Sequence, residues 1–455
     1  MRILLVNRSA RVHTGGVHRM VVESCEWIAR AGHTVGLAYS DGGPSEVACP
    51  TFRLPAGEET AVQRPALERV LAEFQPEALQ LHVATPPFYI QAVGDLIPTC
   101  RFVHDQSWFC SGGDRMSRDF TPCHRPHGFL CLFWHYAQGC GGKNPLGNLD
   151  RWQQVQPLQA VRGSRVRLQV ASEFMRRGLQ ENGYPDNQID VLPLFAAPAA
   201  TGAAMEPGLL LVASRLVKGK GVDFLLRALA GLTHVAWRLV IAGTGPQSAA
   251  LEQMSRAWGL ASRVQFLGEI GPRALESWYA RCQIAVSPVV RREPFGLVGV
   301  EAMAYGKPIV AFEGGATNEW LVDGETGIMV RERTNRALNE ALCRLLSDME
   351  LSRRLGENAR QRWEQYRPET YVARLIASFE RCLQQFRQPP AGQFPPRDRV
   401  VSGASCGWLV ARWWQPAWQP APRVPRPPAD CWCRGICSGQ RGQSRGWSWQ
   451  KPGSC

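Results

Sequence analysis

Two glutamates lie eight residues apart in a segment whose local structure suits the binding of hydroxyl groups. Glu293 precedes an expected helix over residues 296–305, and Glu301 lies about a turn and a half inside it. The first amides of a helix have no intrahelical acceptor and carry the positive end of its dipole. Glu293 can therefore accept hydrogen bonds from the hydroxyls of a sugar, and Glu301 from two vicinal hydroxyls of a ribose. A solvated helix is the alternative. Three amides at this helix start would face the anionic or sugar part of a ligand: Phe295, Gly296 and Leu297.

Two cations occupy the loop between an expected strand, 209–213, and an expected helix, 222–229. Arg215 and Lys220 lie five residues apart in this loop. Two fixed positive charges beside the start of a helix suit a diphosphate. Surface charges on an ordinary loop are the alternative explanation.

A glycine turn containing Gly243 and Gly245 follows the expected strand 238–242. Pro246 suits the first position of the next helix. The third glycine of a dinucleotide-binding fingerprint is absent, because Ser248 stands in its place. A nicotinamide is therefore disfavoured, and no cofactor is expected.

A second pair of glycines, Gly15 and Gly16, precedes an expected helix over residues 17–30. Glycines at the start of a helix allow the backbone to approach an anion closely. An ordinary strand-to-helix turn is the alternative.

Short strand-like runs alternate with helical stretches over two successive halves of the chain. This alternation predicts an α/β protein with two doubly wound parallel sheets, whose ligands bind at the carboxyl ends of the strands. The first half contains six expected strands: 2–6, 34–39, 79–83, 101–104, 167–171 and 189–192. The second half contains five: 209–213, 238–242, 264–267, 283–287 and 308–311. We expect four regions: a domain over 1–195, a second over 196–370, a helix over 371–387 that crosses back to the first, and a tail over 388–455.

The tail, 388–455, is expected to be an unfolded extension. It holds 11 of the 33 prolines, 7 of the 16 tryptophans and 5 of the 15 cysteines, without a sustained apolar period. It also carries 9 basic against 2 acidic residues, more than half of the net charge of +13. The rest of the chain is only mildly basic, so a nucleic-acid partner is not expected. The apolar run after Met1 is too short for a signal peptide, so we expect the cytoplasm, including the inner face of the cell membrane.

In their order and approximate spacing, these motifs resemble the retaining glycosyltransferases of the family-4 type (glycosyl transferases group 1), which have the GT-B fold. The resemblance rests on the Arg215 and Lys220 pair, the glycine turn, Glu293-x7-Glu301 and Gly314-Gly315, and it covers about residues 1–385. It implies two Rossmann-like domains that face a central cleft.

The resemblance also assigns roles to individual residues. Arg215 and Lys220 would hold the donor diphosphate, and Glu301 the ribose. Glu293 would hold the transferred sugar near the reacting carbon. For His104, at the end of the strand 101–104, the resemblance implies a contact to the donor sugar or to the reacting hydroxyl. The loop of Gly15 and Gly16 would lie against the donor phosphates and the acceptor. The remaining donor contacts are implied for Gly243 and Gly245 and for the amides of Phe295, Gly296 and Leu297.

Two other residues near these motifs are left outside the expected site. His82, a rival of His104, is expected to be structural. Glu319 stands four positions after Gly315, whereas the family places its acidic residue three positions on.

The implied activity is transfer of a hexose-type sugar from a nucleotide diphosphate donor to a hydroxyl of a saccharide or lipid-linked saccharide, with retention of configuration. The family needs no catalytic metal. In agreement, none of the 13 aspartates has another two residues away, as metal-binding Asp-x-Asp pairs require. The departing phosphate is thought to take the acceptor's proton, so no protein base is required. We expect a place in cell-surface polysaccharide or lipopolysaccharide biosynthesis. A nucleotide-sugar epimerase and a non-catalytic nucleotide-sugar-binding protein are the alternatives.

Residues 105–145 are unusual for this family and are expected to define the acceptor. Cys110, Cys123, Cys131 and Cys140 lie among several histidines, but no two are closely spaced. Reduced thiols are therefore expected, with a structural zinc as the alternative. The segment also holds several aromatic residues: Trp108, Phe109, Phe129, Phe133, Trp134 and Tyr136. They either pack as core or form an apolar surface for a lipid-linked acceptor, with peripheral membrane contact.

Overall fold

The computed structural model describes residues 1–10, 16–43, 47–55, 60–82, 87–140, 144–155, 157–197 and 204–388. Contacts group residues 1–391 into one unit. Gly15 and the expected tail from residue 389 onward lie outside the described residues.

The amino-terminal lobe is built on a parallel sheet with the described strand order β3-β2-β1-β4-β5-β6-β7. In the register of β1, Leu5 pairs with Leu37 on one side and Gln80 on the other. Because helices cover both faces, the central strands are buried apolar runs, as in other parallel sheets. The strands are β1 (Arg2–Ser9), β2 (Thr34–Asp41), β3 (Thr51–Arg53), β4 (Ala78–Leu81), β5 (Thr99–Val103), β6 (Arg167–Val170) and β7 (Ile189–Val191).

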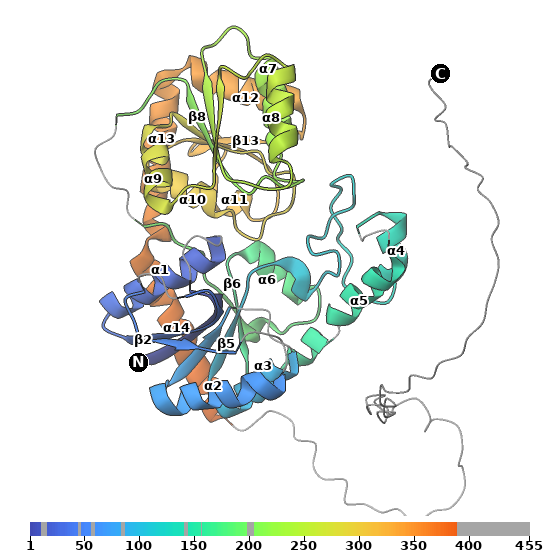
Figure 1. Ribbon diagram of the computed structural model, residues 1–455, viewed down its shortest axis with the longest axis vertical. Coiled ribbons are helices and arrows are strands. Elements are labelled where there is room, and N and C mark those ends of the chain that lie inside the picture. Colours follow the sequence, from blue (N-terminus) through green and yellow to red (C-terminus); the bar gives the residue numbers. More distant parts are fainter. Residues whose placement is uncertain are drawn as a thin grey trace, which may run out of the picture. The chain divides into compact units, whose positions relative to one another are not determined.

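Helices lie on both faces of this sheet (Figure 1). Met20, Cys25 and Ile28 recur at helical spacing on one side of α1 and are buried against one face of the sheet. Leu67 of α2 and Val93 of α3 pack on the other face. The helices are α1 (Gly16–Arg30), α2 (Thr60–Phe74), α3 (Pro87–Leu96), α4 (Cys131–Ala137), α5 (Pro145–Val155) and α6 (Glu173–Gln180), with 3-10 turns at Gln106–Trp108, Pro157–Val161 and Asp186–Gln188.

The carboxyl-terminal lobe repeats the plan with a parallel sheet of described order β10-β9-β8-β11-β12-β13. Its strands are β8 (Leu209–Ala213), β9 (Arg238–Ala242), β10 (Val264–Gly268), β11 (Ile284–Ser287), β12 (Ile309–Phe312) and β13 (Gly327–Val330). Its helices are α7 (Val222–Ala230), α8 (Ser248–Ala257), α9 (Pro272–Arg281), α10 (Leu297–Ala304), α11 (Thr317–Trp320), α12 (Asn335–Ser347) and α13 (Met349–Trp363), followed by a 3-10 turn at Glu364–Tyr366.

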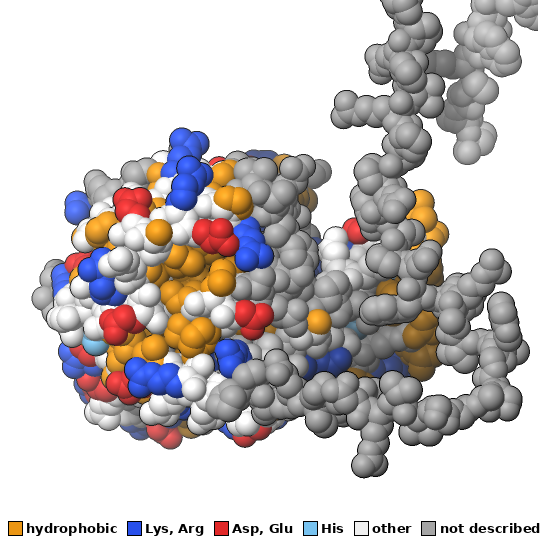
Figure 2. All heavy atoms as spheres, turned by 90° about the horizontal axis from the view of Figure 1, so that it is seen from below, with side chains coloured by type: hydrophobic (Ala, Val, Ile, Leu, Met, Phe, Trp, Pro, Cys, Tyr) orange, Lys and Arg blue, Asp and Glu red, His pale blue; other side chains and the backbone are white. Residues whose placement is uncertain are grey.

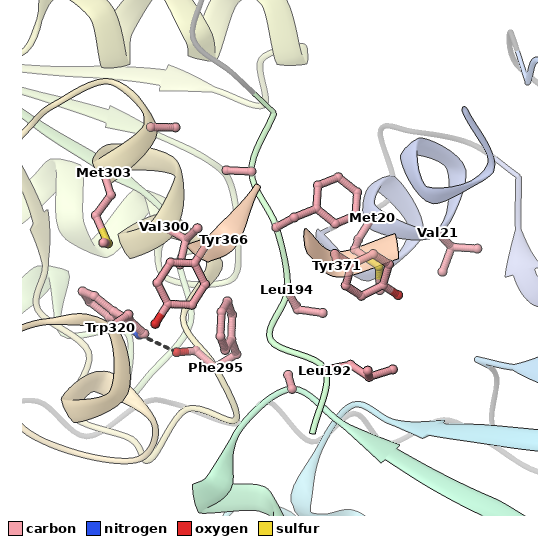
Figure 3. Packing of buried hydrophobic residues seen from close by; sticks show 14 of the residues in the cluster. Met20, Val21, Leu192, Leu194, Phe295, Val300, Met303, Trp320, Tyr366 and Tyr371 are labelled. Atoms are coloured by element: carbon pink, nitrogen blue, oxygen red, sulfur yellow. Dashed lines mark hydrogen bonds between the residues drawn. The ribbon is translucent and has the colours of Figure 1, made fainter. Parts of the chain in front are cut away.

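The last described helix, α14 (Pro368–Arg387), returns to the amino-terminal lobe, where it contacts α1 and β5. Figure 3 shows Tyr371 of α14 near Met20 of α1, and Leu194 on the segment that joins the two lobes. Tyr371 also packs against Phe195, with ring centroids 5.0 Å apart. The start of α14 is thus fixed between the connecting segment and the first helix.

All eleven strands expected from the sequence occur. Their ends agree to within two residues, except that β1 continues three residues further, to Ser9. Two strands, β3 and β13, were not expected; each is an edge strand of three or four residues and too short for a period-2 pattern. The expectation for Pro246 was wrong: α8 begins at Ser248, because Pro246 and Gln247 form a turn in which the Ser248 amide donates to the Gly245 carbonyl.

Acidic and basic side chains are interspersed around apolar ones on the face shown in Figure 2. This mixture agrees with the small charge excess before the tail. None of the helices that the structure describes combines the length and the apolar character needed to span a bilayer.

Candidate functional site

Loops at the carboxyl ends of both sheets border a hollow of about 750 Å³. Ten of the residues expected in the site line it: Gly16, His104, Arg215, Lys220, Gly243, Glu293, Phe295, Gly296, Leu297 and Glu301. Gly15 lies outside the described residues, and Gly245 does not line the hollow. Side chains up to 285 positions apart in the sequence therefore meet at one place.

Lys220 and Glu293 both line this hollow and contact each other. The Lys220 ammonium donates a hydrogen bond to the Glu293 carboxylate, and their side chains are 26% and 21% exposed. Arg215, in the same loop as Lys220, is exposed and has no ion pair or hydrogen bond from its side chain within the described part of the chain. The hollow thus contains one paired ammonium group and one guanidinium group that is free to bind an anion.

Gly245, expected to bind the donor, does not line the hollow, and the structure gives it a packing role. A Cβ atom at this position would lie 2.3 Å from the carbonyl oxygen of Leu216. The Leu216 amide also donates to the Thr244 carbonyl at 2.8 Å. Glycine is thus needed so that the turn after β9 can approach the loop after β8.

The start of α10 forms another wall of the hollow. Gly296 precedes the helix with φ of 95°, a conformation that favours glycine. The indole Nε1 of Trp320 donates to the Phe295 carbonyl at 2.7 Å, as Figure 3 shows, and fixes the turn from behind. The first amides of the helix, including that of Leu297, lack intrahelical acceptors. They can bind an oxygen atom of a ligand.

Glu301 makes two contacts that the sequence did not indicate. Its Oε1 accepts a hydrogen bond from Arg19 Nη1 at 3.0 Å, and its Oε2 accepts one from the Tyr279 hydroxyl at 2.9 Å. Arg19 lies on α1 and Glu301 on α10, so this ion pair joins the two lobes. Both oxygens of the carboxylate expected to hold a ribose are therefore engaged in this structure.

The pKa values of both partners are raised, which favours the neutral form of Glu301 but the charged form of Arg19. Burial raises the pKa of Glu301, and Arg19 and Tyr279 oppose this only in part. Burial also opposes the charged form of Arg19, yet attraction by Glu301 and Glu23 leaves its pKa raised. Because a guanidinium stays protonated at any ordinary pH and lies 3.0 Å from the carboxylate, we treat Glu301 as ionised.

His104 lines the hollow as a neutral imidazole. Burial, followed by the charges of Arg101 and His18, lowers its pKa to about 3. Its Nε2 lies 3.0 Å from Nδ1 of His82, whose pKa burial also lowers well below the usual value. His82 is buried and does not line the hollow, in keeping with the structural role expected for it.

Further contacts join the lobes beside the hollow. The Ser172 hydroxyl donates to the Pro294 carbonyl at 2.5 Å. Glu319, left outside the expected site, accepts hydrogen bonds from the amides of Glu173 and Phe174 at 2.9 and 2.7 Å. These amides begin α6, so the Glu319 carboxylate caps this helix from the other lobe. No sequence signal indicated this pairing.

The unusual segment after β5 carries both buried and exposed aromatic residues. Trp108 and Phe109 belong to the core, whereas Phe129 and Phe133 are 75% and 60% exposed. The four cysteines of this segment form no disulfide. Within the described residues, no group of three or more His, Cys, Asp or Glu side chains is arranged to hold a metal ion.

Comparison with known proteins finds sequence matches to the carboxyl-terminal lobe. Residues 196–362 match the glycosyl transferases group 1 family. The lipopolysaccharide core biosynthesis mannosyltransferase LpcC of Rhizobium leguminosarum bv. viciae is 37% identical over 170 residues, which are 35% of this chain and 47% of that protein. The alpha-D-kanosaminyltransferase of Streptomyces kanamyceticus is 35% identical over 153 residues, 33% of this chain and 39% of that protein. The chain thus spans about half or less of the length of these curated relatives.

Similar solved structures cover both lobes. The sucrose-phosphate synthase of Thermosynechococcus elongatus has a TM-score of 0.64 at 20% identity, over 84% of this chain and 99% of that one. HepE of Anabaena, solved in complex with UDP, has a TM-score of 0.61 at 17% identity, over 84% of this chain and 100% of that one. These similarities confirm the GT-B fold expected from the motifs. The carboxyl-terminal lobe, through residues 196–362, is thus similar to the glycosyl transferases group 1 family.

Proposed function

We propose that this protein transfers a hexose-type sugar from a nucleotide diphosphate donor to an acceptor hydroxyl, with retention of anomeric configuration. The observation that carries the proposal is the meeting of Arg215, Lys220, Glu293 and the start of α10 in one hollow of about 750 Å³. Positive groups for a diphosphate and a carboxylate for a sugar are the two requirements of such a donor.

The leaving diphosphate is stabilised by charge that the fold has already placed. Arg215 and Lys220 offer two cations, and the first turn of α10 adds amides and the positive end of its dipole. Preorganised charge of this kind is often the largest single catalytic term. The departing phosphate oxygen takes the proton of the acceptor hydroxyl on the same face, so no side chain has to act as base. A neutral His104 fits this scheme, because it can exchange a hydrogen bond with a sugar hydroxyl without adding charge.

The ribose would replace one of the present partners of Glu301, whose side chain is only 11% exposed. Arg19 is the partner that can be displaced, because it keeps its second ion pair with Glu23 at 2.7 Å. Tyr279 is buried in the core and stays in place. Donor binding would thus exchange an ion pair between the lobes for hydrogen bonds to the ribose.

The relatives suggest what the donor and the setting are. HepE of Anabaena was solved in complex with UDP and with UDP-glucose, which makes uridine diphosphate sugars the first donors to test. The Rhizobium relative is a lipopolysaccharide core mannosyltransferase, so GDP-mannose is the second, and cell-surface polysaccharide or lipopolysaccharide biosynthesis is the proposed setting. A cytoplasmic location agrees with the supply of such donors.

A thermal-shift panel of nucleotide diphosphate sugars tests the proposal. A donor at 100 times its dissociation constant should stabilise the protein by about 2.7 kcal/mol. Lys220→Ala should lose most of this shift. Lys218→Ala is the matched control, because Lys218 is an exposed lysine of the same loop that does not line the hollow.

Three results would contradict the proposal. An equal response of the parent and of Lys220→Ala would exclude the diphosphate site. Conversion of a bound donor to a new nucleotide sugar without an acceptor would identify an epimerase instead, and binding without any product would identify a non-catalytic binding protein.

We also propose that α4 and α5 contact the membrane surface that carries a lipid-linked acceptor. The two helices pack side by side (Figure 1) and carry large exposed apolar side chains. Arg125 lies 3.9 Å above the ring of Trp134, which adds a cation near this apolar surface. Aromatic side chains beside basic ones suit an interface with anionic lipid. The exposed apolar residues are Phe129 and Leu130 directly before α4, Phe133 and Tyr136 on α4, and Leu146 and Leu149 on α5.

Sedimentation with vesicles of phosphatidylethanolamine and phosphatidylglycerol tests this contact. The parent should pellet with the vesicles, and the double variant Phe129→Ser, Phe133→Ser should stay in the supernatant. Leu96→Ser removes an exposed apolar side chain elsewhere and is the control. A parent that stays in the supernatant would exclude the contact.

A further inference from the structure

A second hollow, of about 620 Å³, lies between the lobes next to the first. The loop after β11 separates the two, because Arg292 lines the second hollow and Glu293 lines the first. Phe174 and Arg177 of α6 contribute from the amino-terminal lobe, and Arg331 from the segment after β13. A group held there would be next to Arg292, the residue before Glu293, whose carboxylate is proposed to hold the donor sugar.

The lining of this hollow is strongly basic. Four arginines, Arg177, Arg292, Arg331 and Arg333, face one carboxylate, Glu313. Such an excess of like charge in a concave surface raises the local concentration of anions.

Two of these arginines lack an acidic partner. Neither Arg177 nor Arg292 forms an ion pair with any described residue, and Arg292 Nη1 is buried with no hydrogen-bond partner there. Burial and then the nearby charge of Arg115 lower the pKa of Arg292. An unpaired, desolvated guanidinium is costly unless an anion joins it.

The other two arginines have partial partners. Arg331 pairs with Asp323 at 3.2 Å, but its side chain is 67% exposed. Arg333 donates to the carbonyls of Phe120 and Glu313 at 3.0 and 3.1 Å and forms no ion pair with a described residue, although the Glu313 carboxylate is near enough to offset part of its charge. The site therefore combines positioned guanidinium groups with room for a phosphate, which arginine binds in a bidentate manner.

We propose that this hollow binds a phosphate group carried by the acceptor saccharide. That the bound molecule is the acceptor rests on the proposed function. That it carries a phosphate group rests on the arginines. The diphosphate of the donor has its own cations, Arg215 and Lys220, in the first hollow. A second anion site on the other side of Glu293 would orient the acceptor, so that its hydroxyl reaches the donor sugar.

Isothermal titration with inositol hexakisphosphate, a phosphorylated cyclic polyol, tests the site. The double variant Arg177→Gln, Arg331→Gln should bind this probe about 10- to 100-fold more weakly than the parent, because it loses two charge-assisted contacts. Both side chains are exposed, so the variant should fold, which its thermal unfolding checks. Inorganic phosphate at the same concentration should bind more weakly than the polyol phosphate, because it cannot reach several guanidinium groups at once.

Control variants separate this site from general charge effects and from the donor site. Arg336→Gln, Arg353→Gln removes two exposed arginines from α12 and α13 and should bind the probe like the parent. Lys220→Ala should also keep the probe, and Arg177→Gln, Arg331→Gln should keep the thermal shift with the donor.

Three outcomes would overturn the inference. The first is that the double variants Arg177→Gln, Arg331→Gln and Arg336→Gln, Arg353→Gln weaken probe binding equally. The others are that Lys220→Ala abolishes probe binding, or that inorganic phosphate binds as tightly as the polyol phosphate. A parent that binds the probe at Arg177 and Arg331 but responds to no nucleotide sugar would refute the proposed function instead, and with it the acceptor role of this site.

Discussion

Replacing Glu293 by glutamine should slow sugar transfer about 100-fold, the size expected for loss of one preorganised polar group in an active site. The amide keeps the shape of the side chain but no longer carries a charge. The variant loses the ion pair that Glu293 forms with Lys220, so the Lys220 ammonium is no longer held beside the start of α10. The measurement is kcat and KM for the donor that the thermal-shift panel identifies.

A second carboxylate of the same hollow serves as the control for this variant. Glu269 also lines the hollow but is exposed and has no ion pair within the described residues. Glu269→Gln should therefore change kcat less than about threefold, a free-energy change below about 0.7 kcal/mol. A rate for Glu293→Gln that equals the parent's would remove Glu293 from the chemistry, whatever the donor proves to be.

The sequence predicted the frame of the site well, because the signals that it uses are local. Strand ends, glycine turns and helix starts follow from runs of five to ten residues. In a parallel sheet all carboxyl ends meet at one edge, so Lys220 and Glu293 were expected close together although 73 positions separate them. The topology thus converts a set of local motifs into one hollow.

The partners of these residues could not be predicted in the same way. Arg19 and Glu301 are 282 positions apart, and their contact depends on how α1 faces α10 across the lobes. The sequence shows only that Arg19 and Glu23 are four residues apart, which suggests an ordinary surface pair on a helix. The position of Gly245 outside the lining of the hollow could not be predicted either, because a glycine needed for packing and one needed for a ligand look the same in a sequence.

Replacing Glu301 by alanine should destabilise the protein by about 3 kcal/mol, even without a donor. The change leaves Arg19 without its partner across the lobes, with a side chain only 17% exposed, and it leaves the buried Tyr279 hydroxyl without an acceptor. Arg19 keeps its ion pair with Glu23. Removing one member of a largely buried ion pair still costs more than that pair contributes, because part of the remaining charge stays desolvated. The midpoint of urea unfolding measures this loss.

Glu301→Gln should be much less harmful to stability than the alanine variant, while it weakens donor binding to a similar degree. Glutamine keeps the shape of the side chain, so its amide stays within reach of both partners of Glu301. The amide oxygen can still accept from Arg19 or Tyr279, but an amide binds two vicinal hydroxyls less well than a carboxylate does. Equal stability of the alanine variant and the parent would show that the lobes do not depend on this ion pair. A glutamine variant with the parent's donor affinity would show that the ribose binds elsewhere. Donor binding would then not displace Arg19 from Glu301.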